Sequence, residues 1–74
     1  MRPVATLRVD VALDPNVRVV AFLCPHSETT ASFRYASPEA AHEGEDEAVR
    51  AVARTHEERF HCGCCAPWLP PRVN

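Results

Sequence analysis

The sequence of 74 residues contains no lysine and no isoleucine, and it has only two glycines and one tryptophan. Large apolar residues are also few, because much of the 46% hydrophobic fraction is alanine. A core this thin seldom holds a chain of this size, and small domains usually add a disulfide set, a metal or a partner chain. The sequence therefore predicts a single small domain that needs one of these supports.

Basic residues are all arginine, and the 8 basic residues are outnumbered by 10 acidic ones, which gives a net charge of −2. An autonomous DNA-binding protein usually has a basic excess, so this balance counts against one, although a local arginine stripe stays compatible with nucleic acid. The absence of lysine beside abundant alanine and valine is typical of GC-rich coding, for example in an actinobacterium or its phage.

A long apolar run is missing as well. The longest, residues 19–24, is too short to span a membrane or to serve as the apolar region of a signal peptide. We therefore expect a cytoplasmic protein with no membrane partner. Thiols stay reduced there, so the four cysteines indicate metal or redox chemistry, with a disulfide from Cys24 to a terminal cysteine as the alternative.

The apolar pattern predicts an α+β fold that begins with a three-stranded antiparallel sheet. Residues 4–13 and 29–36 alternate between apolar and polar side chains, with Leu7, Val9, Val11 and Leu13 on the apolar side of the first segment. Residues 17–24 are almost continuously apolar, which favours the central position in the sheet. Turn-forming residues between the segments favour pairing in sequence order.

One long helix is expected after the sheet. Ser37-Pro38-Glu39 is typical of a helix start, but Gly44 weakens the next stretch, so the regular helix is expected from about Glu45. Gly63 is expected to end it. The apolar face of this helix is predicted to contain Val49, Val52, Ala53, His56 and Phe60. The domain then covers residues 1–65, and the proline-rich residues 66–74 form an extended arm.

Thiol and imidazole side chains gather at two places. One is the turn after the second strand, and the other is the helix end and the residues just beyond it. These are the ligand types that zinc prefers. The candidates are Cys24 and His26 in the turn, and His56, His61, Cys62, Cys64 and Cys65 at the helix end.

Two ligands from a β-turn and two from the end of the following helix is the layout of a ββα zinc finger. From Val17 to about Cys62 the chain resembles the classical Cys-Cys-His-His finger or its His-Cys variant. In that resemblance Cys24 matches the first cysteine, and Ser27 stands where the second is expected, with His26 as its substitute. His56 matches the first helix ligand.

The resemblance implies one structural zinc ion per chain. His61 or Cys62 would supply the second helix ligand, while Cys64 and Cys65 are further candidates or free thiols. The ligand set is therefore expected among Cys24, His26, His56, His61 and Cys62.

Two groups of residues are candidates for contact with a partner. Trp68 and Leu69 lie among prolines in the terminal arm, where a large aromatic side chain can anchor in a partner's pocket. Trp68 folding back over the uncovered face of the sheet is the structural alternative. Arg50 and Arg54 lie on the helix and can contact an acidic partner or phosphate.

These observations favour a zinc-stabilised binding module that contacts another protein as an accessory or regulatory factor. Nucleic-acid binding through the helix arginines is one alternative. A metal-handling or thiol redox protein is another, but its thiols would follow a helix C-terminus, where the helix dipole opposes the thiolate. The chain lacks glycine-rich turns and room for a pocket, so we expect no enzyme, no catalytic residues and no small-molecule substrate.

Overall fold

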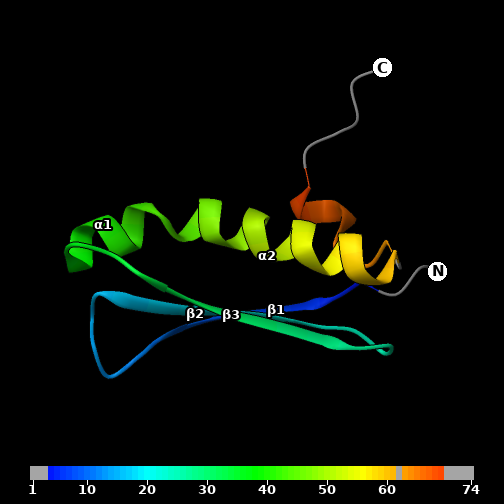
Figure 1. The fold of residues 1–74 in the computed structure, drawn as a ribbon, viewed down its shortest axis with the longest axis horizontal. Helices are drawn as coiled ribbons and strands as arrows, with labels where there is room; N and C mark the ends of the chain where they lie inside the picture. The colour runs from blue at the N-terminus through cyan, green and yellow to red at the C-terminus, as the bar shows by residue number, and fades with distance from the viewer. Residues whose placement is uncertain (1–3, 62, 70–74) are drawn as a thin grey trace, which may run out of the picture.

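The structure, a computed structural model, describes residues 4–61 and 63–69. Figure 1 shows two layers, a twisted sheet and a helical layer that covers one of its faces. No helix in the described part of the chain is long and apolar enough to cross a membrane.

The sheet contains three strands in the order β1-β2-β3, namely β1 (Thr6–Val11), β2 (Val17–Leu23) and β3 (Glu28–Arg34). Both neighbouring pairs are antiparallel, with Val9 opposite Val20 in the first and Val20 opposite Ala31 in the second. This confirms the predicted sequential sheet with the most apolar strand at its centre.

The pleat of β2 sends alternate side chains to the two faces of the sheet. Val20 and Phe22 are fully buried on the face that the helices cover. The prediction that all of Leu7, Val9, Val11 and Leu13 are buried is only half right, because Val11 is 62% exposed and Leu13 is fully exposed. The reason is that β1 is an edge strand, and the main helix packs chiefly over β2 and β3.

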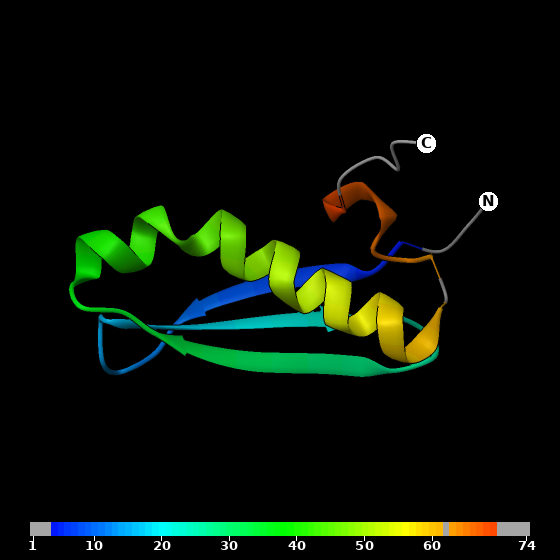
Figure 2. The same ribbon diagram turned by 45° about the horizontal axis from the view of Figure 1, so that its top comes forward.

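In the described residues the sheet is followed by two α-helices where we expected one, namely α1 (Pro38–Glu43) and α2 (Glu45–Phe60), both visible in Figure 2. The Ser37 side chain caps α1 by accepting a hydrogen bond from the Ala40 N–H at 3.1 Å. The break falls at Gly44, where a Cβ would lie 2.5 Å from the Tyr35 ring. The predicted start of the regular helix at Glu45 is confirmed.

The buried face of α2 contains Ala48, Val49, Val52, Ala53 and His56. Phe60, which we expected on this face, is 39% exposed because it is the last residue of α2. Its ring centre nevertheless lies 4.9 Å from that of His56. The helix also ends before Gly63. His61 takes the left-handed conformation, with φ of 49°, and donates its N–H to the Glu57 carbonyl at 2.8 Å.

The described part of the predicted arm is not extended. Ala66–Trp68 forms the 3-10 helix η1, because the Trp68 N–H donates to the Cys65 carbonyl at 2.9 Å. Trp68 packs edge-on against Phe22 with ring centres 5.0 Å apart, so it lies on the helix-covered face and not on the open one. Residues 70–74 of the arm lie outside the described residues.

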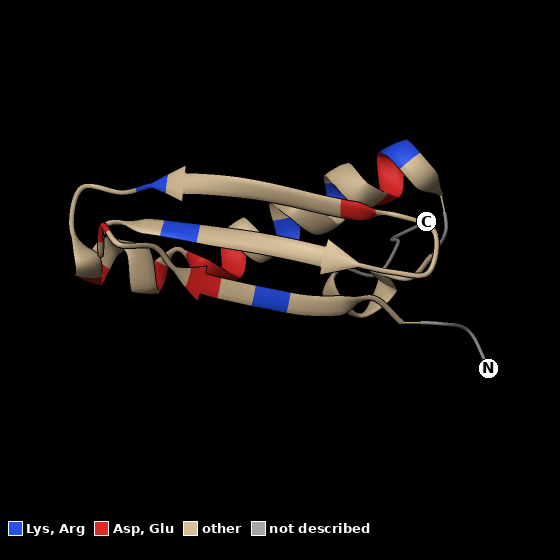
Figure 3. Ribbon diagram, turned by 90° about the horizontal axis from the view of Figure 1, so that it is seen from below, with Lys and Arg blue, Asp and Glu red and all other residues tan. Residues whose placement is uncertain are grey.

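The opposite face of the sheet is not covered by any described element. Figure 3 shows the sheet from this side, with charged residues scattered along the three strands. Apolar side chains of β2 run between the polar rows of β1 and β3.

Candidate metal centre

Three buried side chains from distant parts of the chain meet at one end of the molecule. The Cys24 Sγ, a ring nitrogen of His56 and the Cys64 Sγ all lie within 4.8 Å of one another. Cys24 follows β2, His56 lies near the end of α2, and Cys64 lies in the turn before η1. These residues are close enough to bind a metal ion.

A tight turn between β2 and β3 positions Cys24. The Cys24 N–H donates to the Ser27 carbonyl at 3.0 Å, and the Ser27 N–H donates back to the Cys24 carbonyl at 3.3 Å. Only Pro25 and His26 form the tip. Because Cys24 keeps the alternation of Val20 and Phe22, its side chain enters the core, where it is 7% exposed.

His56 uses its two ring nitrogens differently. Its Nε2 lies 3.5 Å from the Cys24 Sγ and 3.2 Å from the Cys64 Sγ. Its Nδ1 lies 2.8 Å from the Thr29 Oγ1 on β3. A hydrogen bond on Nδ1 fixes the ring and leaves Nε2 as the nitrogen available to a metal, which is the usual arrangement of ligating histidines.

Backbone contacts hold the segment that carries Cys64. Gly63 has a φ of 72°, a conformation that favours glycine, and its N–H donates to the Glu57 carboxylate at 2.9 Å. The Ala5 N–H, just before β1, donates to the Cys64 carbonyl at 2.9 Å. The adjacent Cys65 is fully buried, and its Sγ lies 3.9 Å from the Cys64 Sγ.

The spacing of the donor atoms can be compared with that of a tetrahedral metal site, for which zinc gives the reference distances. Zinc–sulfur and zinc–nitrogen bonds of about 2.3 and 2.0 Å place neighbouring sulfur and nitrogen ligands about 3.6 Å apart, and two sulfurs about 3.8 Å apart. The sulfur–nitrogen separations here are 3.5 and 3.2 Å. Both are close to the separation in a tetrahedral site, and the two sulfurs lie within 4.8 Å of each other. The soft character of the donors makes magnesium and calcium poor candidates for this site.

Electrostatics at Cys24 favour the ligating form. Burial by itself would raise the pKa of the Cys24 thiol, but hydrogen bonds from the backbone N–H groups of His26 and Ser27 outweigh it. Contacts with the side chains of Cys64 and Ser27 act in the same direction. Together they lower the pKa of Cys24 from 9.0 to about 6, and a thiolate is the form that binds metals.

The structure does not bring all five predicted ligands together. Cys24 and His56 lie in the cluster, whereas His26 is exposed at the tip of the turn and His61 is exposed at the helix end. His26 is exposed because β2 ends at Leu23, so the alternation of the strand no longer applies in the turn. His61 is exposed because it follows the last residue of α2 in the left-handed conformation. Cys62 lies outside the described residues. Cys64, a further candidate from the sequence, takes the third place.

One residue of this centre was missed by sequence reasoning. Thr29 is buried and contacts His56, yet it reads as an ordinary strand residue. The signal was present: Thr29 shares the apolar side of β3 with Ala31 and Phe33, and a polar residue on that side needs a buried hydrogen-bond partner.

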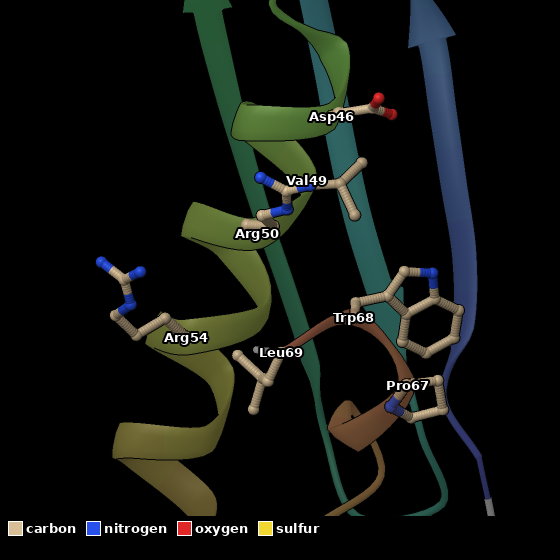
Figure 4. Close-up of a pocket in the computed structure, with 7 residues that line it drawn as sticks. All are labelled: Asp46, Val49, Arg50, Arg54, Pro67, Trp68 and Leu69. Carbon is tan, nitrogen blue, oxygen red and sulfur yellow. The ribbon is translucent and has the colours of Figure 1, made fainter. Parts of the chain in front are cut away.

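The predicted partner-contacting residues also come together, in a groove that none of the three donor residues lines. Arg50 and Arg54 on α2, and Trp68 and Leu69 on and beside η1, line a single open groove. Figure 4 shows this groove, with Val49 and Asp46 on the helix side and Pro67 on the other.

Comparison with known proteins gives no match: no protein-family model, no curated protein and no solved structure is similar to this chain.

Proposed function

We propose that this protein is a small zinc-stabilised binding module that acts by contacting another protein. The observation that carries the proposal is the buried cluster of Cys24, His56 and Cys64. The metal in this proposal is zinc, because two thiolates and one imidazole form a donor set that zinc prefers.

A structural role for the zinc is supported by burial. The three donor residues are 7%, 0% and 1% exposed, so solvent has little access to the centre. Catalytic zinc sites keep an open position for a water or a substrate, and structural sites close it with a fourth protein ligand. Zinc bound in this way contributes on the order of 10–16 kcal/mol to folding of a small domain, more than its thin core supplies.

The fourth ligand is proposed to come from a cysteine beside Cys64. Cys65 is supported by the separation of 3.9 Å between its Sγ and that of Cys64, close to the spacing of two thiolates on one zinc ion. Cys62 is the other candidate. Single Cys62→Ser and Cys65→Ser variants loaded with Co²⁺ separate them, because loss of a thiolate lowers the sulfur-to-cobalt charge-transfer absorption.

Native mass spectrometry compared with an acid-denatured spectrum of the same sample tests the metal. We expect the native mass to exceed the denatured mass by one zinc ion, and the denatured mass to correspond to four reduced thiols. Absence of metal from protein purified without chelators, together with stable folding, would contradict the proposal.

The kinetics of metal loss separate a structural zinc from a metal-handling or redox role. A structural zinc leaves only as the protein unfolds, so its transfer to a chelator is slow and follows the unfolding rate. Rapid transfer from folded protein would favour metal handling instead. Burial of Cys24 and Cys64 supports the slow outcome.

A further inference from the structure

The groove between α2 and η1 has two chemically different walls. Arg50 and Arg54 lie on the α2 side, with the Arg54 guanidinium directed away from η1, while Trp68 and Pro67 lie on the η1 side and Leu69 lies between Trp68 and α2 (Figure 4). The groove has a volume of about 730 Å³ and is open to solvent. Ligand grooves in proteins are typically 300–1,000 Å³ in volume.

The two arginines differ from the other arginines that the structure describes. Arg8, Arg18 and Arg34 lie within ion-pair distance of carboxylates, and Arg59 lies over the Phe60 ring. Within the described residues, neither Arg50 nor Arg54 forms an ion pair. Both are exposed on a protein with a net charge of −2, so this wall is a positive site on an otherwise acidic molecule.

The geometry of α2 sets the spacing of acidic groups that this wall can bind. Arg50 and Arg54 are one helical turn apart, so their backbones are separated by about 6 Å along the helix axis. In an extended peptide, residues i and i+2 point to the same side and are about 6.6–6.8 Å apart. An extended peptide along the groove thus presents alternate residues to the arginines and the intervening residues to Trp68 and Leu69.

We propose that this groove binds an extended segment of a protein partner in which acidic residues alternate with apolar ones. The proposal rests on the proposed function, since it names the partner's chemistry, but it does not depend on which metal is bound. Asp46 lines the same groove near the start of α2, and it orients the peptide by repelling carboxylates from that end. Asp46 and the acidic net charge disfavour a nucleic-acid backbone in the groove.

The test uses ¹⁵N-labelled, metal-loaded protein and three synthetic peptides. The probe is acetyl-Gly-Glu-Leu-Glu-Leu-Glu-Gly-amide. The first control has the same composition but no two acids at i and i+2, acetyl-Gly-Glu-Leu-Leu-Glu-Glu-Gly-amide, and the second replaces each Glu of the probe by Lys. We expect saturable amide shifts from the probe at Val49, Arg50, Arg54, Trp68 and Leu69, and binding of both controls weaker by about tenfold.

Charge-reversal variants decide whether the arginine wall is responsible. The double variant Arg50→Glu/Arg54→Glu should bind the Glu probe at least about tenfold more weakly and should gain affinity for the Lys peptide. Arg59→Glu is the matched control on the same helix, and it should leave the affinity for the probe within about twofold. Both changes are at exposed positions, and the dispersion of the amide spectrum checks folding.

Three results overturn the inference. One is equal binding of the probe and its rearranged control, and another is absence of saturable shifts at the groove. The third is a ligand of the other class: fluorescein-labelled oligothymidine binds the natural protein and not the double variant, and the Glu probe does not bind the natural protein. Native mass spectrometry on the same samples reports the metal, so failure of the groove and failure of the zinc proposal are distinguished.

Discussion

The two ends of the helix–sheet sandwich are held together in different ways. At the end where β2 begins and α2 starts, hydrogen bonds join protein groups directly: the Arg18 Nη1 donates to the Pro15 carbonyl at 2.7 Å, and the Tyr35 hydroxyl donates to the Gly44 carbonyl at 3.2 Å. At the other end, Cys24, His56 and Cys64 point their donor atoms at a common centre.

The difference shows what a thin core needs. Arg18 lies on the covered face of β2 and is only 6% exposed, so its long side chain contributes to packing at this end. The cysteine end has small side chains instead, and two thiols beside an imidazole supply little packing by themselves. In our proposal a metal ion supplies there the cohesion that hydrogen bonds supply at the opposite end.

The largest effect is expected from removing one ligand at the cysteine end. Cys24→Ser changes the volume little but removes a thiolate, so we expect the free energy of unfolding to fall by at least about 3 kcal/mol. Thermal unfolding with and without a chelator measures it. The chelator should lower the melting temperature of the natural chain toward that of Cys24→Ser and leave the variant unaffected.

Ser27→Ala is the matched control for that change, because Ser27 lies in the same turn and contacts the Cys24 Sγ only at 3.8 Å. It should keep the response to the chelator. Equal chelator responses in the natural chain and Cys24→Ser would show that the cluster does not hold the metal.

A second effect concerns the hydrogen bond that orients His56. Thr29→Val keeps the side-chain shape but removes the hydroxyl from the His56 Nδ1, so zinc affinity should fall by about 10–100-fold. Competition with a chromophoric chelator measures this affinity. Thr30→Val is the control, since Thr30 is exposed and contacts Glu28 instead; an equal loss in both variants would contradict a specific role for Thr29.

At the opposite end, Gly44→Ala tests direct packing. The new Cβ would lie 2.5 Å from the Tyr35 ring, so we expect a loss of about 1–3 kcal/mol although alanine favours helices. Urea unfolding measures the loss, and adding Tyr35→Ala should make the Gly44 change much less costly. Zinc affinity should stay unchanged, whereas a marked decrease would show that the two ends are not independent.

A smaller, stabilising effect is expected for His61→Gly. His61 has a φ of 49°, a conformation that costs a non-glycine residue roughly 1–2 kcal/mol and that glycine adopts without strain. Part of this gain is lost, because glycine gives the unfolded chain more conformational freedom. The free energy of unfolding should rise by up to about 1 kcal/mol in denaturant titrations. The variant should bind the same number of metal ions as the natural chain. A variant that binds no metal would show that His61 is a ligand.

The smallest effect lies in the β1–β2 turn. The Asn16 N–H and, to a lesser extent, the Arg34 guanidinium hold the pKa of Asp14 below its ordinary value of 3.8. A lowered pKa adds stability that is present above the unfolded value and is lost as the pH falls through the folded one. Arg34→Ala should therefore raise the Asp14 pKa toward 3.8 in a carboxyl ¹³C titration, and an unchanged pKa would contradict the contribution of Arg34.

Most of the fold could be predicted from the sequence because local patterns decide it. Alternation in β1 and β3, the apolar run of β2 and the weak point at Gly44 each depend on residues close in the chain. Phe60 and Leu13 were misplaced because their exposure depends on how far the helix and sheet overlap, which no local pattern contains.

The candidate site was predictable in residue type and in region, but not in its members. Cys24 and His56 could be found because each lies on the buried side of its own element. His26 and His61 could not be excluded, since the choice depends on a two-residue turn and on where α2 ends. The groove residues were predicted singly, and only the path of η1 shows that they share a surface.

The hydrogen bond between the Ala5 N–H and the Cys64 carbonyl has a consequence for the order of folding. The two hairpins and α2 need only neighbouring residues, so they can form quickly. The cysteine end brings together Cys24 and Cys64, which are far apart in the sequence, and Ala5 must then pair with Cys64. Contacts between such distant residues form slowly. Metal capture is therefore expected as the last step, with zinc-dependent refolding showing a late phase that reports Trp68 docking on Phe22.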